Sequence, residues 1–384
     1  MTEREGMVRL MVDAVHKFAR EELLPAEEQV ETNEEIPENI IEQMKAFGLF
    51  GMTVPEQYGG LGLSTLEEVQ VVFEVTYASP VFRSYFGTTN GVGTLGLVNE
   101  GTGAQREKYL PRIARGDLIA SFCLTEPDSG SDAASLITKA TRDGENYVIN
   151  GTKRFITNAI HAGLFTVFAR TAPRDVGVSG ISAFLVERDT PGITVAKPYR
   201  KMGFNGSHES DVIFDNVRVP ADALLGAEGG GFRSAMRSLD HARVHMAAVA
   251  TGLCFRLLDE GLKYAEERAQ FGKPIASFQM IQGMLAESQA EAFAARAMVE
   301  KAAKMKDEGL DITMESACCK YFATEAAGRI ADRMLQIHGG NGYIKEYAIE
   351  RLFRDARLLR IFEGTSQIQQ LIIAREMRRR GIQA

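Results

Sequence analysis

The pattern of apolar residues changes twice along the chain, and this order of patterns limits the folds that the chain can adopt. Up to about residue 118 apolar residues recur at spacings of three and four, as in Met7, Leu10, Met11, Val15 and Phe18, which predicts helices. From about 119 to 225 short apolar runs are separated by Gly, Asp and Pro, which predicts strands. The glycine-rich segment 226–232 ends that region, and helical patterns follow it.

The predicted elements divide into three domains. The strand-like runs include 118–124, 147–149, 164–169, 181–186 and 211–219, and the later helices are 231–269, 278–309, 313–338, 348–361 and 366–380. Helices of these lengths suit a bundle. We therefore expect an α+β protein with an N-terminal helical domain at 1–118, a middle β domain at 119–226 and a C-terminal helical bundle at 227–384.

Composition and charge exclude several classes of function. With 44 Lys and Arg against 51 Asp and Glu, the formal charge is -7, and no basic stripe of a nucleic-acid-binding protein is evident. The N-terminus contains acids and lacks the apolar core of a signal peptide, and the most apolar helical stretch, 244–255, is too short to span a bilayer. The cysteines show neither zinc-site spacing nor a dense disulfide framework. We expect a cytoplasmic protein that binds neither nucleic acid nor membrane.

Two short motifs are better explained by packing than by ligand binding. The segment Gly91–Gly96 matches G-x-G-x-x-G, but it follows a helical segment rather than a strand, so we expect these glycines to permit close helix packing. His241 and His245 lie one helical turn apart, as metal ligands can. No glutamate accompanies them as in H-E-x-x-H, and no third ligand is evident nearby. We therefore predict packing or hydrogen-bonding histidines and no metal site.

Polar clusters follow two of the predicted strands. Residues 122–132 close one strand and contain Thr125, Ser129 and Ser131. Their hydroxyls, together with free backbone N–H groups, suit the binding of a polar ring or a phosphate. Taken alone, such a loop is more typical of a polar surface turn. A second cluster, 154–158, follows another strand.

A third candidate is Glu363, on the connection between two predicted helices. Ser366 with Gln369 matches a capping box, so a helix is expected to begin there. Glu363 then lies on a turn after the apolar run 358–362, where desolvation raises the pKa of a carboxyl group and lets it act as a general base. Gly364 lets a ligand approach the backbone. Taken alone, the motif favours an exposed linker glutamate.

Together, in this order and spacing, these motifs closely resemble the acyl-CoA dehydrogenase family over essentially the whole chain. The resemblance implies an N-terminal helical domain, a middle β-barrel-like domain and a C-terminal four-helix bundle, assembled as a homotetramer. The matching segments are Thr125–Pro127 with Gly130–Asp132, Phe155–Thr157, Lys201–Gly203, Val217–Pro220, Arg268–Pro274 with Gln279, Gln336–Gly342 and Glu363–Gln367.

The resemblance implies FAD as the cofactor, between the β domain and the bundle. Residues that match flavin-ring contacts are Phe122, Leu124, Thr125, Ser131, Phe155 and Thr157. The family often has Trp at the place of Phe155, and this chain keeps an aromatic face there. Residues that match diphosphate and adenosine contacts across a subunit interface are Arg268, Phe271, Phe278, Gln279, Gln336, Gly339 and Gly340, with the remaining FAD contacts at Thr365 and Gln367.

The same resemblance assigns Glu363 as the catalytic base. It implies removal of the α-proton of an acyl-CoA thioester while the β-hydrogen leaves as hydride to flavin N5, with electrons passing to an electron-transfer flavoprotein. Ser131, Asp240, Arg243 and Gly364 match substrate contacts. Some relatives carry the base on the long helix, at the position of Ala242 here, which leaves Glu363 as the candidate.

The segment Phe82–Gly87 resembles glutaryl-CoA dehydrogenases, in which an arginine pairs with the distal carboxylate of the substrate. Arg83 then favours acyl-CoAs that carry a second acidic group. The alternative is an exposed arginine, or one paired with Glu74. Decarboxylating relatives have Tyr at the place of Phe362, which favours simple oxidation here. Other readings are an ordinary short-chain acyl-CoA dehydrogenase, a desulfinase or eliminating enzyme, a flavin oxidase or monooxygenase, and a non-enzymatic scaffold.

Overall fold

The computed structural model describes residues 2–381 and begins with helices. They are α1 (Glu3–Phe18), α2 (Leu24–Asn33), α3 (Glu38–Ala46), α4 (Thr65–Val75), α5 (Pro80–Asn90), α6 (Val92–Glu100) and α7 (Gly103–Ala114). Thr2, Ser64 and Thr102 form capping boxes with the residue three positions on, which accounts for the starts of α1, α4 and α7. Helix α5 begins after Ser79, with Pro80 in its first turn.

An eight-stranded sheet follows, with the order β6-β7-β3-β2-β4-β5-β8 and β1 paired beside β4. Its strands are β1 (Ala120–Cys123), β2 (Lys139–Asp143), β3 (Asn146–Thr157), β4 (Leu164–Arg170), β5 (Ile181–Glu187), β6 (Ile193–Val195), β7 (Glu209–Pro220) and β8 (Leu224–Leu225). The long pair β3–β7 is antiparallel and contains a bulge between Lys153 and Ile156.

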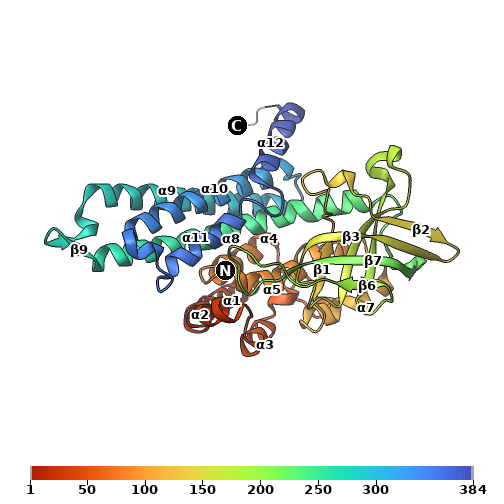
Figure 1. The fold of residues 1–384 in the computed structure, drawn as a ribbon, viewed down its shortest axis with the longest axis horizontal. Helices are drawn as coiled ribbons and strands as arrows, with labels where there is room; N and C mark the ends of the chain where they lie inside the picture. The colour runs from red at the N-terminus through yellow and green to blue at the C-terminus, as the bar shows by residue number, and fades with distance from the viewer. Residues whose placement is uncertain (1, 382–384) are drawn as a thin grey trace.

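The C-terminal helices are α8 (Gly231–Glu267), α9 (Gln279–Asp307), α10 (Thr313–His338), α11 (Ala348–Leu358) and α12 (Ser366–Arg380). A two-stranded hairpin, β9 (Ala269–Gln270) with β10 (Lys273–Pro274), separates α8 from α9. Figure 1 shows α8 to α11 extending to one side, the sheet on the other side and the N-terminal helices beneath their junction.

The long helices agree with the sequence pattern within a few residues, whereas the sheet differs more. The patterns missed β2, β6 and β8, and they gave only the first part of β3. These strands are short or carry few buried residues, so their apolar alternation is weak. The prediction for the glycine motif is confirmed, because Gly93 lies in α6 and a Cβ there would come within 2.6 Å of the Ala120 carbonyl oxygen on β1.

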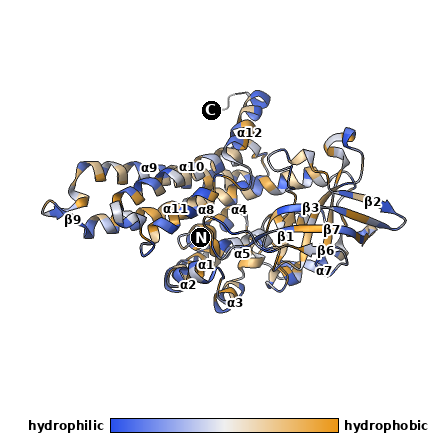
Figure 2. Ribbon diagram, in the orientation of Figure 1, coloured by the Kyte–Doolittle hydropathy of each residue, from blue (hydrophilic) through white to orange (hydrophobic). Residues whose placement is uncertain are grey.

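One large core joins the N-terminal helices to the C-terminal helices, and two smaller cores lie against the sheet. Figure 2 shows hydrophobic and hydrophilic residues alternating along most helices, as amphipathic helices require. Among the described residues no helix is both long enough and apolar enough to cross a membrane.

Glu27 of α2 joins four elements through its buried carboxylate. It accepts hydrogen bonds from Arg256 of α8 at 3.2 and 3.3 Å, from Arg351 of α11 at 2.6 Å and from the backbone N–H of Ser79, the N-cap of α5, at 2.7 Å. Two guanidinium groups therefore share one carboxylate that is 4% exposed, although Arg256 has a second partner in Glu260 at 2.8 Å.

We expect the substitution Glu27→Gln to destabilise the protein by about 3 kcal/mol or more, because it leaves buried positive charge unpaired. The midpoint of thermal denaturation measures this effect. Glu28→Gln, at the exposed next position, is the matched control and leaves the midpoint unchanged. Equal midpoints for the two variants would contradict the role given to Glu27.

Candidate active site

The turn between α11 and α12 has an unusual backbone. Glu363 has φ 54° and Gly364 has φ 88°, so two successive residues adopt left-handed conformations. Such a conformation is unfavourable for a residue with a side chain, and it persists only where the surroundings impose it. Glu363 therefore sits at a position that the rest of the structure holds in place.

Two side chains hold this turn. Lys320 of α10 is buried and donates a hydrogen bond to the Gly364 carbonyl at 2.8 Å. Gln369 donates to the carbonyls of Glu363 at 3.2 Å and Gly364 at 3.0 Å. The expected capping box at Ser366 and Gln369 is wrong in detail: Thr365 is the N-cap of α12, and its side chain accepts from the Ile368 N–H. Gln369 is engaged with the turn instead.

Three cations act on the Glu363 carboxylate. Burial raises the pKa of Glu363, because desolvation disfavours the charged carboxylate, while Arg83, Lys320 and Arg243 act in the opposite direction. The alternative of an exposed linker glutamate is therefore wrong. Burial also lowers the pKa of Lys320 to about 8, and the Glu363 carboxylate opposes that shift.

Arg83 lies inside the protein rather than on its surface, since only 6% of it is exposed. Gly87 makes room for it one turn along α5, where a Cβ would come within 2.4 Å of Arg83 Nε. Within residues 2–381 its guanidinium makes one hydrogen bond, from Nε to His245 Nε2 at 2.7 Å, and no carboxylate lies within ion-pair distance of it. The alternatives of an exposed Arg83 or a pair with Glu74 are wrong, because Glu74 pairs with His16 and Arg20.

A buried polar chain lies behind Arg83. Because Arg83 donates to His245 Nε2, the proton of this imidazole is on Nδ1, which donates to Glu68 Oε1 at 2.7 Å. His241 Nε2 lies 2.8 Å from Glu68 Oε2, and Lys306 contacts the other nitrogen of His241. Burial and the charge of Arg83 lower the pKa of His245 to about 4, so this imidazole is neutral near pH 7. The prediction of hydrogen-bonding histidines is confirmed.

Arg243 and Asp240 form an ion pair on the same helix, α8. Asp240 also accepts a hydrogen bond from the Thr313 hydroxyl at 3.2 Å. Burial raises the pKa of Asp240 and lowers that of Arg243, and each charge counteracts the shift of the other. This pair lies close enough to Glu363 for Arg243 to act on it electrostatically.

The polar loop after β1 is shaped by a buried ion pair. Lys153 of β3 donates to Glu126 Oε1 at 2.7 Å, and the Glu126 carboxylate also accepts from the N–H groups of Ile137 and Thr138. Thr125 and Ser131 remain partly or fully exposed on this loop. Because the ion pair fixes the loop from inside, the hydroxyls of Thr125 and Ser131 stay available on the outside, whereas Ser129 is buried and donates to the Asp132 carbonyl at 2.6 Å.

Phe155 extends the same region as an exposed aromatic ring. It has φ 56°, lies within the bulge of β3 between Lys153 and Ile156, and is 58% exposed. Its ring lies 5.2 Å from that of Tyr199, measured between centroids. Phe122, Leu124 and Thr157 lie on the neighbouring ends of β1 and β3, which Ser121 joins by a hydrogen bond to the Thr157 carbonyl at 2.7 Å.

The remaining predicted cofactor residues lie elsewhere. Arg268 ends α8, and Phe271, which is 92% exposed, lies in the β9–β10 hairpin at the far end of the C-terminal helices, opposite the sheet (Figure 1). Phe278, Gln279, Gln336, Gly339 and Gly340 belong to the adjoining ends of α9 and α10. One copy of the chain does not bring this group to Phe155 and Thr125. Thr365 and Gln367 lie beside Glu363, at the start of α12.

Several residues of the site escaped the sequence patterns. Lys320 and Glu68 are single charges within helices, and nothing in their neighbourhood indicates burial. Lys153 and Glu126 are 27 positions apart, so their pairing depends on the fold. The helical spacing of His241 and His245 did indicate a paired role, but it did not identify Glu68 as their partner.

Comparisons with known proteins agree with this arrangement. Models of the N-terminal, middle and C-terminal domains of acyl-CoA dehydrogenases match residues 7–117, 121–217 and 229–378. An acyl-CoA dehydrogenase of Bacillus subtilis is 44% identical over 375 residues, which are 98% of each chain. The CarC subunit of the caffeyl-CoA reductase–Etf complex of Acetobacterium woodii is 39% identical over 374 residues, 97% of this chain and 98% of that one.

A solved structure of glutaryl-CoA dehydrogenase in complex with glutaryl-CoA matches with a TM-score of 0.94 at 33% identity, covering 100% of this chain and 96% of that one. The predicted order of helical, sheet and helical domains is confirmed by these matches. The chain belongs to the acyl-CoA dehydrogenase family, whose enzymes are FAD-dependent oxidoreductases.

Proposed function

We propose that this enzyme dehydrogenates an acyl-CoA thioester between its α and β carbons, with Glu363 as the base. The observation that carries the proposal is the Glu363 turn: a carboxylate with a raised pKa, held in a strained conformation between Lys320 and Gln369. A base of raised pKa is suited to proton abstraction near neutral pH. Strain of this kind is typical of functional sites.

The residues present fit FAD in two separate groups. The loop at Thr125 and Ser131, together with the exposed ring of Phe155, offers polar groups and an aromatic face for the flavin. Arg268 is exposed at the end of α8, and its guanidinium makes no hydrogen bond or ion pair within the described residues, so this group is free to bind diphosphate oxygens. When bound, FAD supplies the acceptor for the hydride that leaves the β carbon.

The backbone of the Glu363 turn has a second role. The N–H of Glu363 makes no hydrogen bond within the described part of the chain. It is therefore free to donate to the thioester carbonyl, where negative charge develops as the α-proton leaves. Gly364 has no side chain to obstruct this approach. Asp240 and Arg243 are proposed to contact the CoA portion of the substrate.

We further propose that Arg83 selects acyl groups that carry a second acid. A buried cation without a directly contacting anion is unfavourable. The hydrogen-bond acceptor of Arg83 within the described residues is a neutral imidazole, and the Glu363 and Glu68 carboxylates act on Arg83 only electrostatically. A carboxylate at the far end of the acyl group would complete the pairing. Phe362 provides no hydroxyl for a following decarboxylation, so we propose simple oxidation. An ordinary short-chain substrate and elimination from a sulfinated acyl-CoA are the competing proposals.

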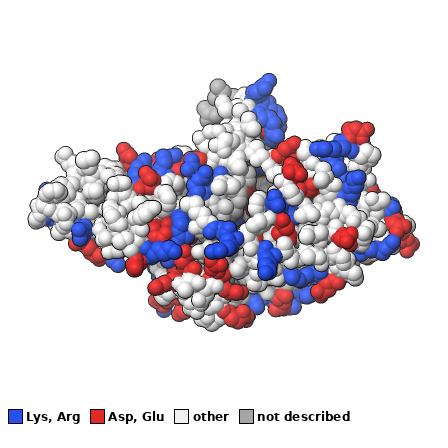
Figure 3. Space-filling model, viewed as in Figure 1, with Lys and Arg blue, Asp and Glu red and all other residues white. Residues whose placement is uncertain are grey.

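The proposed electron partner is an electron-transfer flavoprotein, in line with the name of the caffeyl-CoA reductase–Etf relative. That relative is named a reductase, so the same residues are compatible with the reverse reaction on an enoyl-CoA. A homotetramer is proposed because the far end of the C-terminal helices exposes Phe271, Met280 and Tyr343, at 92%, 81% and 90%. Figure 3 shows that this end carries few charges. A cytoplasmic location stays a prediction.

Replacing Glu363 by Gln is expected to slow reduction of the flavin by substrate about 10²- to 10⁴-fold, because the α-proton loses its acceptor. Anaerobic mixing with butyryl-CoA and glutaryl-CoA, followed by bleaching of the flavin band, measures this rate. Glu346→Gln, at an exposed position, is the control. An unchanged rate in a Glu363→Gln variant that retains FAD would assign the proton to another group.

Replacing Arg83 by Met keeps an unbranched, flexible side chain, two atoms shorter than that of arginine, and removes its charge. For glutaryl-CoA we expect kcat/KM to fall about 30-fold or more, since a buried charge pair is lost. Butyryl-CoA serves as the internal control and is expected to change little. If both substrates respond equally, Arg83 does not select a second acid; turnover of butyryl-CoA alone by the unchanged enzyme indicates an ordinary short-chain dehydrogenase.

The rate of flavin reduction is expected to rise with pH through the pKa of Glu363, because the base acts in its deprotonated form. Lys320→Met removes a cation that lowers this pKa. The midpoint of the rise is therefore expected to move to higher pH. Lys197→Met, which removes an exposed charge, is expected to leave it in place. A midpoint that moves to lower pH, or not at all, would contradict the electrostatic role of Lys320.

A further inference from the structure

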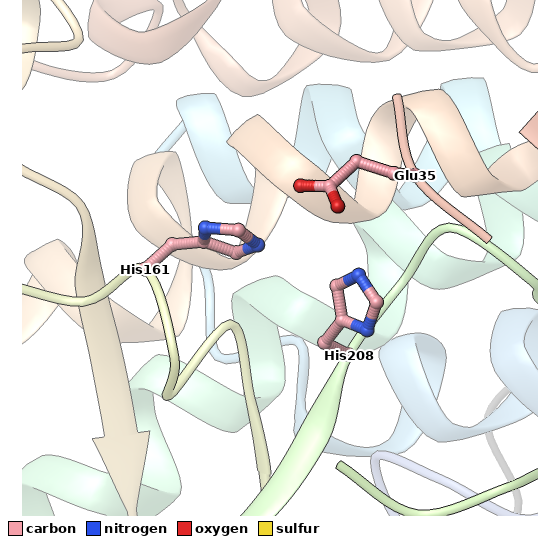
Figure 4. A group of neighbouring side chains, drawn as sticks. All are labelled: Glu35, His161 and His208. Atoms are coloured by element: carbon pink, nitrogen blue, oxygen red, sulfur yellow. The ribbon is translucent and has the colours of Figure 1, made fainter. Parts of the chain in front are cut away.

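A second group of ionisable side chains lies where the N-terminal helices meet the sheet. Glu35 belongs to the segment between α2 and α3, His161 to the turn after β3, and His208 directly precedes β7. One potential ligand atom from each lies within 4.8 Å of the others. Figure 4 shows the two imidazole rings and the carboxylate pointing toward one another.

The backbone brings the two histidines together. Thr157 and Glu209 are paired in the β3–β7 ladder, and the N–H of Asn158 donates to the His208 carbonyl at 2.7 Å. Both imidazoles therefore come from the same end of one strand pair, and Glu35 comes from the helical domain that packs against it.

None of these three side chains has another polar partner. Within residues 2–381 they make no hydrogen bond and no ion pair. The Nε2 atom of His208 is enclosed and still lacks a hydrogen-bond partner. Leaving buried polar atoms unpaired is costly, so such atoms in a native protein commonly have a ligand or water as a partner. Burial and the neighbouring His208 lower the pKa of His161, which favours the neutral imidazole that binds metals.

The group formed by Glu68, His241 and His245 has the same composition but a different environment. Its carboxylate already contacts both imidazoles, and the outer nitrogens face Arg83 and Lys306. A metal dication there would displace these bonds and lie beside two cations. The Glu35 group has no such bonds to displace, and the cation near it, Arg188, is already engaged with the backbone carbonyls of residues 159, 160 and 162.

We propose that Glu35, His161 and His208 bind one divalent transition-metal cation of the zinc class. Two imidazole nitrogens and a carboxylate oxygen are a ligand set that Zn²⁺ accepts, with solvent at the fourth position. Bond lengths of about 2.0–2.2 Å place the ligand atoms of a tetrahedral site roughly 3.3 Å apart, so the group must contract slightly. Glu35 is exposed and can make that movement, and it also leaves the ion a path from solvent.

The bound ion would join the helical domain to the end of β3 that carries Phe155 and Thr157. Asn158 already connects this strand end to α5, through bonds from its amide to the carbonyls of Ser84 at 3.0 Å and Tyr85 at 2.9 Å. The metal would add a second connection between this strand end and the helical domain, through Glu35. Its role is therefore structural, and the proposal does not depend on the acyl-CoA chemistry.

Zn²⁺ titrated into the FAD-loaded, EDTA-treated protein tests the proposal by calorimetry. We expect one ion per chain and a higher midpoint of thermal denaturation in the presence of Zn²⁺. The variants His161→Ala, His208→Ala and Glu35→Gln are each expected to weaken binding by at least the roughly 10- to 100-fold that loss of an outer-sphere partner costs. Glu34→Gln, one position away, is the matched control and binds Zn²⁺ like the unchanged protein.

Anomalous diffraction at the zinc edge locates the ion directly. Density between Glu35, His161 and His208 supports the proposal. Absence of binding heat, binding that the three variants leave unchanged, or density at Glu68 instead would overturn it. Because Glu35 is exposed, the Glu35→Gln variant is expected to fold. It therefore tests the site even if a histidine variant fails to fold.

Discussion

The structure depends on burying one long helix that carries ionisable side chains. Residues 241–254 of α8 are all buried, and helices from both halves of the chain pack around them. An unpaired charge in such surroundings costs several kcal/mol. His241 and His245 therefore share Glu68 from α4, and farther along the helix Arg256 pairs with Glu27 from α2. These partners fix how the N-terminal helices sit on α8.

The same pairing determines the charge of the site. With the histidines neutral, the buried and half-buried side chains of the site comprise four cations and three carboxylates: Arg83, Arg243, Lys306 and Lys320 face Glu68, Asp240 and Glu363. Glu68 is occupied by the two histidines, which hold its pKa well below the usual value against the effect of burial. Within the described residues, the other N–H groups of the Arg83 guanidinium therefore have no acceptor, and an anionic acyl group would supply one.

How much of the structure could be predicted from the sequence depends on how far apart along the chain the interacting residues are. The helices from α8 to α12 repeat their apolar residues locally, so their positions were predicted nearly to the residue. The turn at Glu363 was also local, although Thr365 rather than Ser366 caps α12. In contrast, Glu68 and His245 are 177 positions apart, and no local pattern marks such a pair. The family resemblance assigned Glu363 and Arg83, but it did not identify the groups that hold them.

Three of the predicted site residues other than glycine have a positive φ, and only one of these three lacks a local cause. Phe271 precedes Gly272 in a two-residue hairpin turn, which requires positive φ. Phe155 lies within a β-bulge, which bends a strand in this way.

Glu363 lies in neither, so its conformation rests on the bonds of Lys320 and Gln369 to the turn. Arg83 is also fixed in position. It donates a hydrogen bond to His245, and its side chain fills the space that the absent side chain of Gly87 leaves free. Both groups are therefore in place before any substrate binds. If the proposed function holds, a site organised in this way adapts little to its ligand, and the length and charge of the acyl group would decide which substrate fits.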